Sequence, residues 1–386
     1  MKEKLAIIGR GTGGCFAITH FLKWTDWEID WYFDPAILPQ AVGEGSNLIM
    51  PNALFTNMNF TYDKLISIDG SIKLGLEKTG WGDGHKYHEY FSPPSVGYHF
   101  NAVKLQDYII DFAKQSNRIK FIPLNISNKE IDADYIMDCS GKPTDLSDYN
   151  TTLIPVNAVH VTQCYWDAMK FNHTLTLARP YGWVFGIPLQ NRCSIGYLYN
   201  SNINSLDEVK EDVKNIFKEY NLTPSEDTNS FKFNSYYKKE NYSERVIYNG
   251  NASFFLEPLE ATSFGFMDFI QRRAFTFWKK HKNETAEQLN QIYIDQAKQI
   301  ETVIMMHYFA GSQFDTKFWE YAKQQGQISM ESMKDHALFK EMVIESQPNL
   351  NNFIIRSDFG QWPISLFKLN IANLNIYDRL KEILEK

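Results

Sequence analysis

The stretch Lys4-Leu5-Ala6-Ile7-Ile8-Gly9-Arg10-Gly11-Thr12-Gly13-Gly14 decides the fold of this chain. Its apolar start, residues 4–8, predicts a short buried strand, and the apolar spacing from Cys15 to Leu22 predicts a helix after the glycines. Residues 28–33 predict a second strand, which ends at Asp34. A strand, a glycine turn, a helix and a strand in this order open a dinucleotide-binding α/β fold.

The glycines fit the pattern Gly9-x-Gly11-x-x-Gly14. In this pattern the first glycine makes the turn, the second lets the backbone approach a pyrophosphate, and the third lets helix and strand pack closely. The start of the helix adds N–H groups and partial positive charge. A tight structural turn without a ligand is the alternative. The predicted cofactor contacts are Gly9, Gly11, Thr12, Gly13, Gly14 and Asp34, whose carboxylate suits a ribose hydroxyl.

Composition narrows the function classes. The chain has 386 residues and a net charge of −7 with no basic stripe, which argues against a nucleic-acid surface. No cleavable leader and no run of about 18 apolar residues is visible, so we expect a cytoplasmic protein with no membrane contact. The aromatic content of 15% suits sheets around a flat cofactor or an aromatic ligand, or simply an aromatic core. The spacing of His85 and His88 fits no zinc motif, so we expect no metal.

The pattern along the chain predicts a discontinuous organisation. Residues 1–70, 100–150 and 240–270 form the expected dinucleotide-binding domain, which is Rossmann-like. The family resemblance given below implies that this domain binds FAD and is of the glutathione-reductase type. Residues 71–99 and 151–239 alternate in short β-type runs and form the expected β-rich substrate domain. Residues 271–386 are mainly helical, with helices predicted over 284–308, 317–324 and 377–386. The fold class is therefore α/β, with the two domains interleaved and C-terminal helices added.

Four further segments carry candidate chemistry. Val42-Gly43-Glu44-Gly45-Ser46 suits a loop that passes along an extended cofactor, although any polar surface loop could look like this. Lys73 lies in the alternating segment 71–76 and should point opposite to Ile72, Leu74 and Leu76, as an ordinary solvated strand lysine would. Gly182-Trp183-Val184-Phe185-Gly186-Ile187-Pro188 could be an aromatic strand entering a core. Phe255 to Phe264, which reads FLEPLEATSF, could be a loop that caps a helix starting near Phe264.

Taken in chain order, these segments resemble the flavin-dependent tryptophan-halogenase family, and His307-Tyr308 through Phe318-Trp319 extends the resemblance to about residue 322. The resemblance implies that Gly43, Glu44, Gly45 and Ser46 form a strap on the flavin, which Phe264 also contacts. It further implies that Lys73 is the catalytic lysine and that Glu260 works opposite it. Backbone N–H groups at Thr262 and Ser263 would hold the halide, while Trp183, Phe185 and Pro188 would form a spacer between flavin and substrate.

The resemblance also implies an activity. Reduced FAD, supplied by a separate flavin reductase, would react with O₂ and halide to give hypohalous acid, which would halogenate an aromatic or heteroaromatic small molecule. The halide stays open among chloride, bromide and iodide, and self-association is the family expectation. A flavin-dependent monooxygenase or reductase, or a non-catalytic flavin-binding protein, are the alternatives.

This sequence departs from the family pattern at three places. Phe185 stands in place of a Trp, Ala261 in place of a Ser and Ser263 in place of a Gly. Because Ser cannot adopt every backbone conformation open to Gly, the change at Ser263 bears directly on the halide site.

Overall fold

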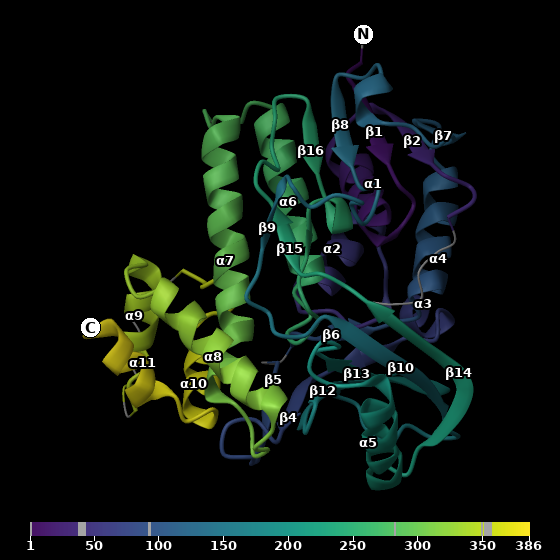
Figure 1. Cartoon of the computed structure of the whole chain (residues 1–386). Coiled ribbons are helices and arrows are strands. Elements are labelled where there is room, and N and C mark those ends of the chain that lie inside the picture. Colours follow the sequence, from purple (N-terminus) through teal and green to yellow (C-terminus); the bar gives the residue numbers. More distant parts are fainter. Residues whose placement is uncertain (1, 38–43, 92–93, 282, 349, 351–356) are drawn as a thin grey trace. The chain divides into compact units, whose positions relative to one another are not determined.

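The computed structural model describes residues 2–37, 44–91, 94–281, 283–348, 350 and 357–386 (Figure 1). The chain divides into two compact units. The first unit contains Met1–Ile72, Ser95–Thr151 and Tyr236–Asp295, and the second contains Lys73–Pro94, Thr152–Ser235 and Gln296–Lys386. Residues 271–386, expected to form one helical region, are divided between the units at residue 295. That the first unit binds FAD and the second binds substrate stays a prediction.

The first unit is built on a five-stranded parallel sheet with the order β16-β8-β1-β2-β7. Strands β1 (Lys4–Ile8) and β2 (Glu28–Phe33) have the predicted bounds. Leu5, Ala6 and Ile7 are fully buried, as expected for a central strand of a parallel sheet. The other strands of this sheet are β7 (Ile119–Pro123), β8 (Tyr135–Asp138) and β16 (Val246–Tyr248).

Helices and two small sheets complete the first unit. The predicted helix after the glycine turn is α1 (Thr12–Trp24), which contacts β1. The strand pair β3 (Ser71–Lys73) and β6 (Gly97–His99) forms a two-stranded sheet, and β17 (Phe254–Phe255), β15 (Tyr236–Lys238) and β9 (Tyr149–Thr151) form a three-stranded one. The remaining elements are α2 (Ile49–Met58), α3 (Tyr62–Ser67), α4 (Ala102–Lys114), η1 (Asn128–Glu130), η2 (Gly250–Ala252), α6 (Ser263–Trp278) and the first part of α7 (Ala286–Ala310).

The second unit is built on a seven-stranded sheet with the order β14-β10-β13-β12-β11-β4-β5. The β11–β4 pair is parallel and the other five pairs are antiparallel. One face packs against α5 (Leu206–Glu219), where Val209, Val213 and Ile216 join a hydrophobic cluster of the sheet. The strands are β4 (Gly75–Thr79), β5 (Lys86–Tyr90), β10 (Ala158–Tyr165), β11 (Thr174–Arg179), β12 (Gly182–Pro188), β13 (Arg192–Tyr199) and β14 (Thr223–Lys232).

The C-terminal helices differ from the prediction in extent. Helix α8 (Lys317–Ser332) continues well past residue 324, where the predicted helix ends. A Cβ at Gly326 would lie 2.4 Å from the backbone nitrogen of Phe309 in α7, so this glycine serves close helix packing and does not end the helix. Helices α9 (Ala337–Glu345) and α10 (Ile364–Asn373) were not predicted, and α11 (Tyr377–Leu384) begins at the predicted residue.

Candidate active site

The glycine turn joins β1 to α1. Gly9 has a φ of +97°, and a Cβ there would lie 2.1 Å from the carbonyl oxygen of Cys139. A Cβ at Gly14 would lie 2.0 Å from the carbonyl oxygen of Gly9. At Gly11, by contrast, no atom of the described residues lies within 4 Å of the Cβ position. The turn is therefore packed closely at Gly9 and Gly14 and open at Gly11, where a pyrophosphate would approach.

The start of α1 adds electrostatic attraction for an anion. Thr12 is the first helical residue, and the first N–H bond within the helix runs from Cys15 to the carbonyl oxygen of Gly11, at 3.0 Å. The N–H groups of the first turn have no partner inside the helix and carry the positive end of its dipole. A Cβ at Gly13 would lie 3.2 Å from Cα of Gly250, so Gly13 allows a close backbone contact. These features fit a dinucleotide phosphate.

Asp34 follows directly after β2, at the carboxyl end of the parallel sheet. Its Oδ1 accepts a hydrogen bond from the backbone N–H of Ala36 at 2.8 Å, and its Oδ2 accepts one from Asn125 Nδ2 at 2.9 Å. These bonds fix a half-buried carboxylate at the position predicted for a ribose contact. Gly43, the predicted first residue of the flavin strap, lies outside the described residues.

Glu44, Gly45 and Ser46 follow as a short extended segment. The N–H of Ser46 donates to the carbonyl oxygen of Tyr98 at 2.9 Å, and Gly45 forms a β-bridge with His99 of β6. Glu44 is buried, and its Oε1 accepts a hydrogen bond of 3.4 Å from the N–H of Ala102 at the start of α4. Backbone pairing thus fixes the course of this segment, and the Glu44 carboxylate complements a helix N-terminus.

Glu260 lies in the loop between β17 and α6. It is buried, with 5% of its surface exposed. The N–H of Ala261 donates to the carbonyl oxygen of Pro258 at 3.0 Å, which closes a turn around Glu260. Ala261 has a φ of +51°, while Ser263 is the first residue of α6 and has helical geometry. The left-handed residue is therefore Ala261, so the change to Ser at position 263 needs no special conformation.

Thr262 and Phe264 flank Ser263 at the N-terminus of α6. Thr262 is the N-cap residue, and its carbonyl oxygen accepts the bond from the N–H of Phe266 at 3.0 Å. The ring of Phe264 packs against Phe16 of α1 and Phe100, with centroid distances of 5.0 Å and 5.4 Å. These contacts anchor the start of α6 to α1, so that two helix N-termini belong to the same unit.

Lys73 ends β3 and is the first residue of the second unit. Only 1% of its surface is exposed, whereas the adjacent Leu74 is 41% exposed. The Nζ atom lies 5.7 Å from the ring centroid of Phe91, within the range of a cation–π contact. Lys73 does point away from Leu74, as predicted, but it points into the protein. A solvated strand lysine is thereby excluded.

The predicted spacer residues lie on β12, inside the seven-stranded sheet. Trp183 is fully buried and Pro188 is buried, while Phe185 is half-buried. A Cβ at Gly196, the residue opposite Phe185 on β13, would lie 2.0 Å from Cζ of Phe185. The Phe185 ring therefore covers the backbone of Gly196. Trp183 and Phe185 share one face of the sheet, and α5 covers the other face.

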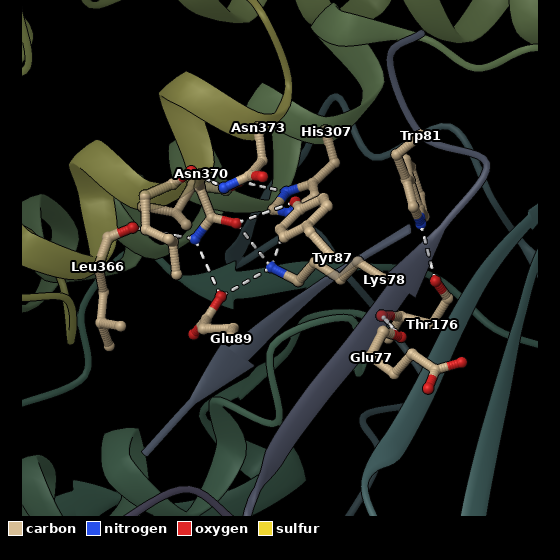
Figure 2. Close-up of polar contacts among 12 residues, drawn as sticks. Glu77, Lys78, Trp81, Tyr87, Glu89, Thr176, His307, Leu366, Asn370 and Asn373 are labelled. Carbon is tan, nitrogen blue, oxygen red and sulfur yellow. Dashed lines mark hydrogen bonds and ion pairs between the residues drawn. The ribbon is translucent and has the colours of Figure 1, made fainter. Parts of the chain in front are cut away.

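Trp81 is the centre of an aromatic cluster in the second unit. Its ring centroid lies 5.5 Å from His307, 5.8 Å from Tyr308, 5.4 Å from Trp319 and 6.4 Å from Trp183. The Trp81 Nε1 donates to the carbonyl oxygen of Thr176 at 3.0 Å (Figure 2). The structure thus brings Trp81 together with Trp183, His307 and Trp319 of the resemblance segments, although these residues are far apart in the sequence.

Sequence reasoning missed a buried polar cluster next to Trp81. Lys78, Glu89 and Asn370 have at most 2% of their surfaces exposed and bond to one another and to His307 (Figure 2). Burial and the nearby charge of Lys78 lower the pKa of His307 well below its usual value. The one available signal was the lysine at position 78, which shares the apolar face of β4 with Leu76.

Three further observations concern a buried cysteine, metal binding and membrane-spanning helices. Cys139 directly follows β8, and burial raises the pKa of its thiol well above the usual value, as in a packed thiol. Within the described ranges, no group of three or more His, Cys, Asp and Glu side chains is arranged to hold a metal ion. The helices in these ranges include none that is both long enough and apolar enough to span a membrane.

The amino-acid sequence of this chain is similar to those of known proteins. The family model for Tryptophan halogenase matches residues 111–362, well over half of the chain. Tryptophan 7-halogenase KtzQ of Kutzneria sp. (strain 744) is 23% identical over 262 residues, which cover 60% of this chain and 48% of the relative. Tryptophan 7-halogenase RebH of Lentzea aerocolonigenes is 23% identical over 283 residues, which cover 63% of this chain and 50% of the relative. The chain spans about half the length of these curated relatives.

Solved structures extend the likeness to the whole chain. BrvH, a flavin-dependent halogenase from Brevundimonas sp. BAL3, gives a TM-score of 0.77 at 15% identity and covers 100% of this chain and 96% of its own. A tryptophan halogenase from Shewanella frigidimarina NCIMB 400 gives a TM-score of 0.77 at 16% identity and covers 100% of this chain and 93% of its own. The fold is therefore that of the flavin-dependent halogenases, which confirms the predicted fold class. With the family match, the chain belongs to the tryptophan halogenase family.

Proposed function

We propose that this protein is an enzyme that uses reduced FAD, O₂ and halide to halogenate an aromatic or heteroaromatic small molecule through Lys73 and Glu260. The burial of Lys73 carries the proposal. A lysine is rarely buried unless its environment compensates the charge, and here the lysine is inside while its apolar neighbour Leu74 is exposed. Solvation would favour the opposite arrangement. A buried lysine beside an exposed leucine is expected where the lysine amine takes part in a reaction.

The first unit offers a suitable place for FAD. The open side of Gly11 and the N-terminus of α1 suit the pyrophosphate, and the half-buried Asp34 suits a ribose hydroxyl. Glu44 to Ser46 and Phe264 are proposed to contact the flavin. Bound reduced FAD would supply two of the four electrons that O₂ takes up, and the halide would supply the other two, so that the halide becomes hypohalous acid and the second oxygen atom becomes water. A separate flavin reductase is proposed to deliver the reduced cofactor.

Lys73 would then control the hypohalous acid. Its amine can hold this species by a hydrogen bond, or react with it to form a haloamine and water. Either way, the halogen that reaches the ring is electrophilic, and the ring loses a proton in exchange. Glu260 is proposed to polarise the halogen donor and to stabilise the positive charge that develops on the ring. Carboxylate stabilisation of this kind is strong in a cavity of low dielectric constant.

Two further roles complete the proposal. The N–H groups of Thr262 and Ser263 would bind halide at the N-terminus of α6, where the helix dipole favours an anion. Trp183, Phe185 and Pro188 would separate flavin from substrate and so discourage direct hydroxylation. Phe185 keeps an aromatic wall at its position without an indole N–H.

The test is turnover with reduced FAD, O₂ and each halide in turn, with an electron-rich phenol, an indole and free tryptophan as acceptors. Halogenated product is read by its isotope pattern in mass spectrometry, and we expect it for at least one halide and acceptor. Lys73→Met should abolish halogenation while FAD binding persists, and Glu260→Gln should slow it by about 100-fold or more. Hydroxylated product alone would assign the protein to the flavin monooxygenases. Unchanged halogenation by Lys73→Met would remove that residue from the mechanism.

A further inference from the structure

The β4–β5 hairpin contains a second buried lysine, Lys78, which is 0% exposed. Its Nζ donates to Glu89 Oε2 at 2.9 Å and to Asn370 Oδ1 at 2.9 Å, and lies 3.0 Å from His307 Nε2 (Figure 2). These partners belong to β5, α10 and α7, and all four residues lie in the second unit. One ammonium group therefore joins a strand of the sheet to its neighbour and to two helices.

The hydrogen bonds of His307 settle how this cluster is protonated. Nδ1 of His307 lies 3.0 Å from the carbonyl oxygen of Val303, which can only accept, so Nδ1 carries the proton. Nε2 then accepts from Lys78, in agreement with the lowered pKa of His307. Lys78 thus places each of its three protons on an acceptor. Because these three bonds engage its amine inside the second unit, we assign Lys78 a different role from the one proposed for Lys73.

Asn370 is a residue of α10 and connects this helix to the cluster. Its Nδ2 donates to Glu89 Oε2 at 3.0 Å, and its Oδ1 also accepts from the hydroxyl of Tyr87 at 3.2 Å. Lys78, Glu89 and Asn370 all lie outside residues 111–362, the part of the chain that the family model matches. His307 is the one cluster residue inside that match, so the cluster combines one matched residue with three from outside it.

The same two chain segments carry the contact of Lys73 with Phe91. Lys73 precedes Lys78 by five residues, and Phe91 follows Glu89 by two. The N–H of Phe91 donates to the carbonyl oxygen of Leu74 at 2.9 Å, next to Lys73. A displacement of β4 along β5 would therefore move Lys73 relative to Phe91, and the Lys78–Glu89 ion pair opposes such a displacement.

We propose that Lys78 is a positioning residue that holds Lys73 in its buried place, through the ion pair with Glu89 and the bonds to Asn370 and His307. Replacing a buried ion pair by apolar residues of similar size is often neutral for stability, so the charges are better explained by the geometry that they fix. For the reaction itself, this inference rests on the proposed function. Loss of the cluster would leave a folded protein in which Lys73 is misplaced.

The test uses the double variant Lys78→Met/Glu89→Met, which removes both charges together and leaves neither one unpaired. The first readout is acylation of Lys73 by an amine-reactive reagent, followed by peptide mass spectrometry. We expect labelling about tenfold faster than in the wild type, with a similar melting temperature. The matched control is Lys86→Met on the same hairpin, because Lys86 is exposed and lies on its opposite face. This control should leave the labelling of Lys73 unchanged.

The second readout is turnover. A small misplacement of a reactive group can cost up to about 100-fold, so kcat for halogenation should fall at least tenfold with KM for the acceptor unchanged. Hypohalous acid released to solution, trapped with taurine, should rise in proportion. Wild-type labelling and turnover in the double variant would overturn the proposal.

Should the double variant not fold, Asn370→Leu keeps both charges and removes the contact to α10. Unchanged labelling of Lys73 in that variant would contradict the proposal equally. If the wild type forms no halogenated product, the proposed function fails, while the labelling comparison still decides the role of Lys78.

Discussion

The carbonyl oxygen of Gly9 occupies the space that a side chain at Gly14 would need. A Cβ at Gly14 would lie 2.0 Å from that oxygen, and the nitrogen of the Trp31 ring already donates to the same oxygen at 2.8 Å. The glycine turn is thus held on the protein side by close packing and by hydrogen bonds to the protein itself, before any cofactor is considered. This separates two functions that the glycine pattern combines, namely the packing of strand against helix and the approach of a ligand.

We expect Gly14→Ala to destabilise the folded protein. The added methyl group must displace backbone, because the atom that it meets is a carbonyl oxygen and not the end of a flexible side chain. Overpacking of this kind costs about 1–3 kcal/mol in free energy of unfolding. Urea unfolding followed by circular dichroism measures the change. A variant with wild-type stability would show that the turn is looser than described.

Gly11→Ala should have the opposite profile. Gly11 has a φ of −74° and a ψ of −172°, which alanine adopts without strain, and its Cβ position faces open space among the described residues. We therefore expect a change in unfolding free energy within about 0.5 kcal/mol. The methyl group would stand where a pyrophosphate is proposed to lie, so the Kd for FAD should rise at least about tenfold. Flavin fluorescence titration measures the Kd, and unchanged affinity would place the cofactor elsewhere.

Ala261→Gly should stabilise the protein. Ala261 has a φ of +51°, a region that costs a residue with a Cβ about 1–2 kcal/mol, and glycine avoids most of this cost. After allowing for the greater backbone entropy of glycine when unfolded, the net gain should be about 0.5–1 kcal/mol. Ser263→Gly is the matched comparison: it lies in α6, where glycine should lower stability. Equal effects of the two changes on urea unfolding would contradict this assignment of the strained residue.

The sequence was most informative where structure is local. Residues 4–8 form a strand with the predicted bounds because they are a short, mostly apolar run that ends at a glycine turn. Residues 28–33 do so because their aromatic and β-branched residues favour a strand and Asp34 follows them. The orientation of Lys73 was harder. Its segment alternates as far as Leu74, but Gly75 has a φ of +152°, so Leu76 is buried instead of following the exposed Leu74. A single glycine thus shifted the alternation on which the prediction depended.

The Lys78 cluster could not be predicted for a different reason. Lys78 bonds to residues 11, 229 and 292 positions away, and no local pattern relates partners so distant. Helix α10 itself escaped prediction because its ten residues include two Asn and no acidic residue in the first turn, so tertiary contacts such as that of Asn370 must hold it. The family match could not supply this information either, because of the four cluster residues only His307 lies within residues 111–362.

Glu301 in α7 makes stability depend on pH. It is 8% exposed, and its Oε1 accepts a hydrogen bond from the N–H of Leu153 at 2.7 Å. Burial raises its pKa from 4.5 to about 7 in the folded protein. The folded state therefore binds more protons than the unfolded state between these two values. The stability contributed by the neutral carboxyl is fully present below the unfolded pKa and is lost as the pH rises through about 7.

We accordingly expect Glu301→Gln to gain stability relative to the wild type as the pH is raised. The amide keeps an oxygen acceptor for Leu153 and cannot ionise, so the difference in unfolding free energy between pH 5 and pH 8 should shift by up to about 3 kcal/mol in favour of the variant. Urea unfolding at the two pH values measures it. Glu287→Gln, which removes an exposed carboxylate from the same helix, should leave the wild-type pH dependence in place. A Glu301→Gln protein with that same dependence would mean that Glu301 ionises freely when folded.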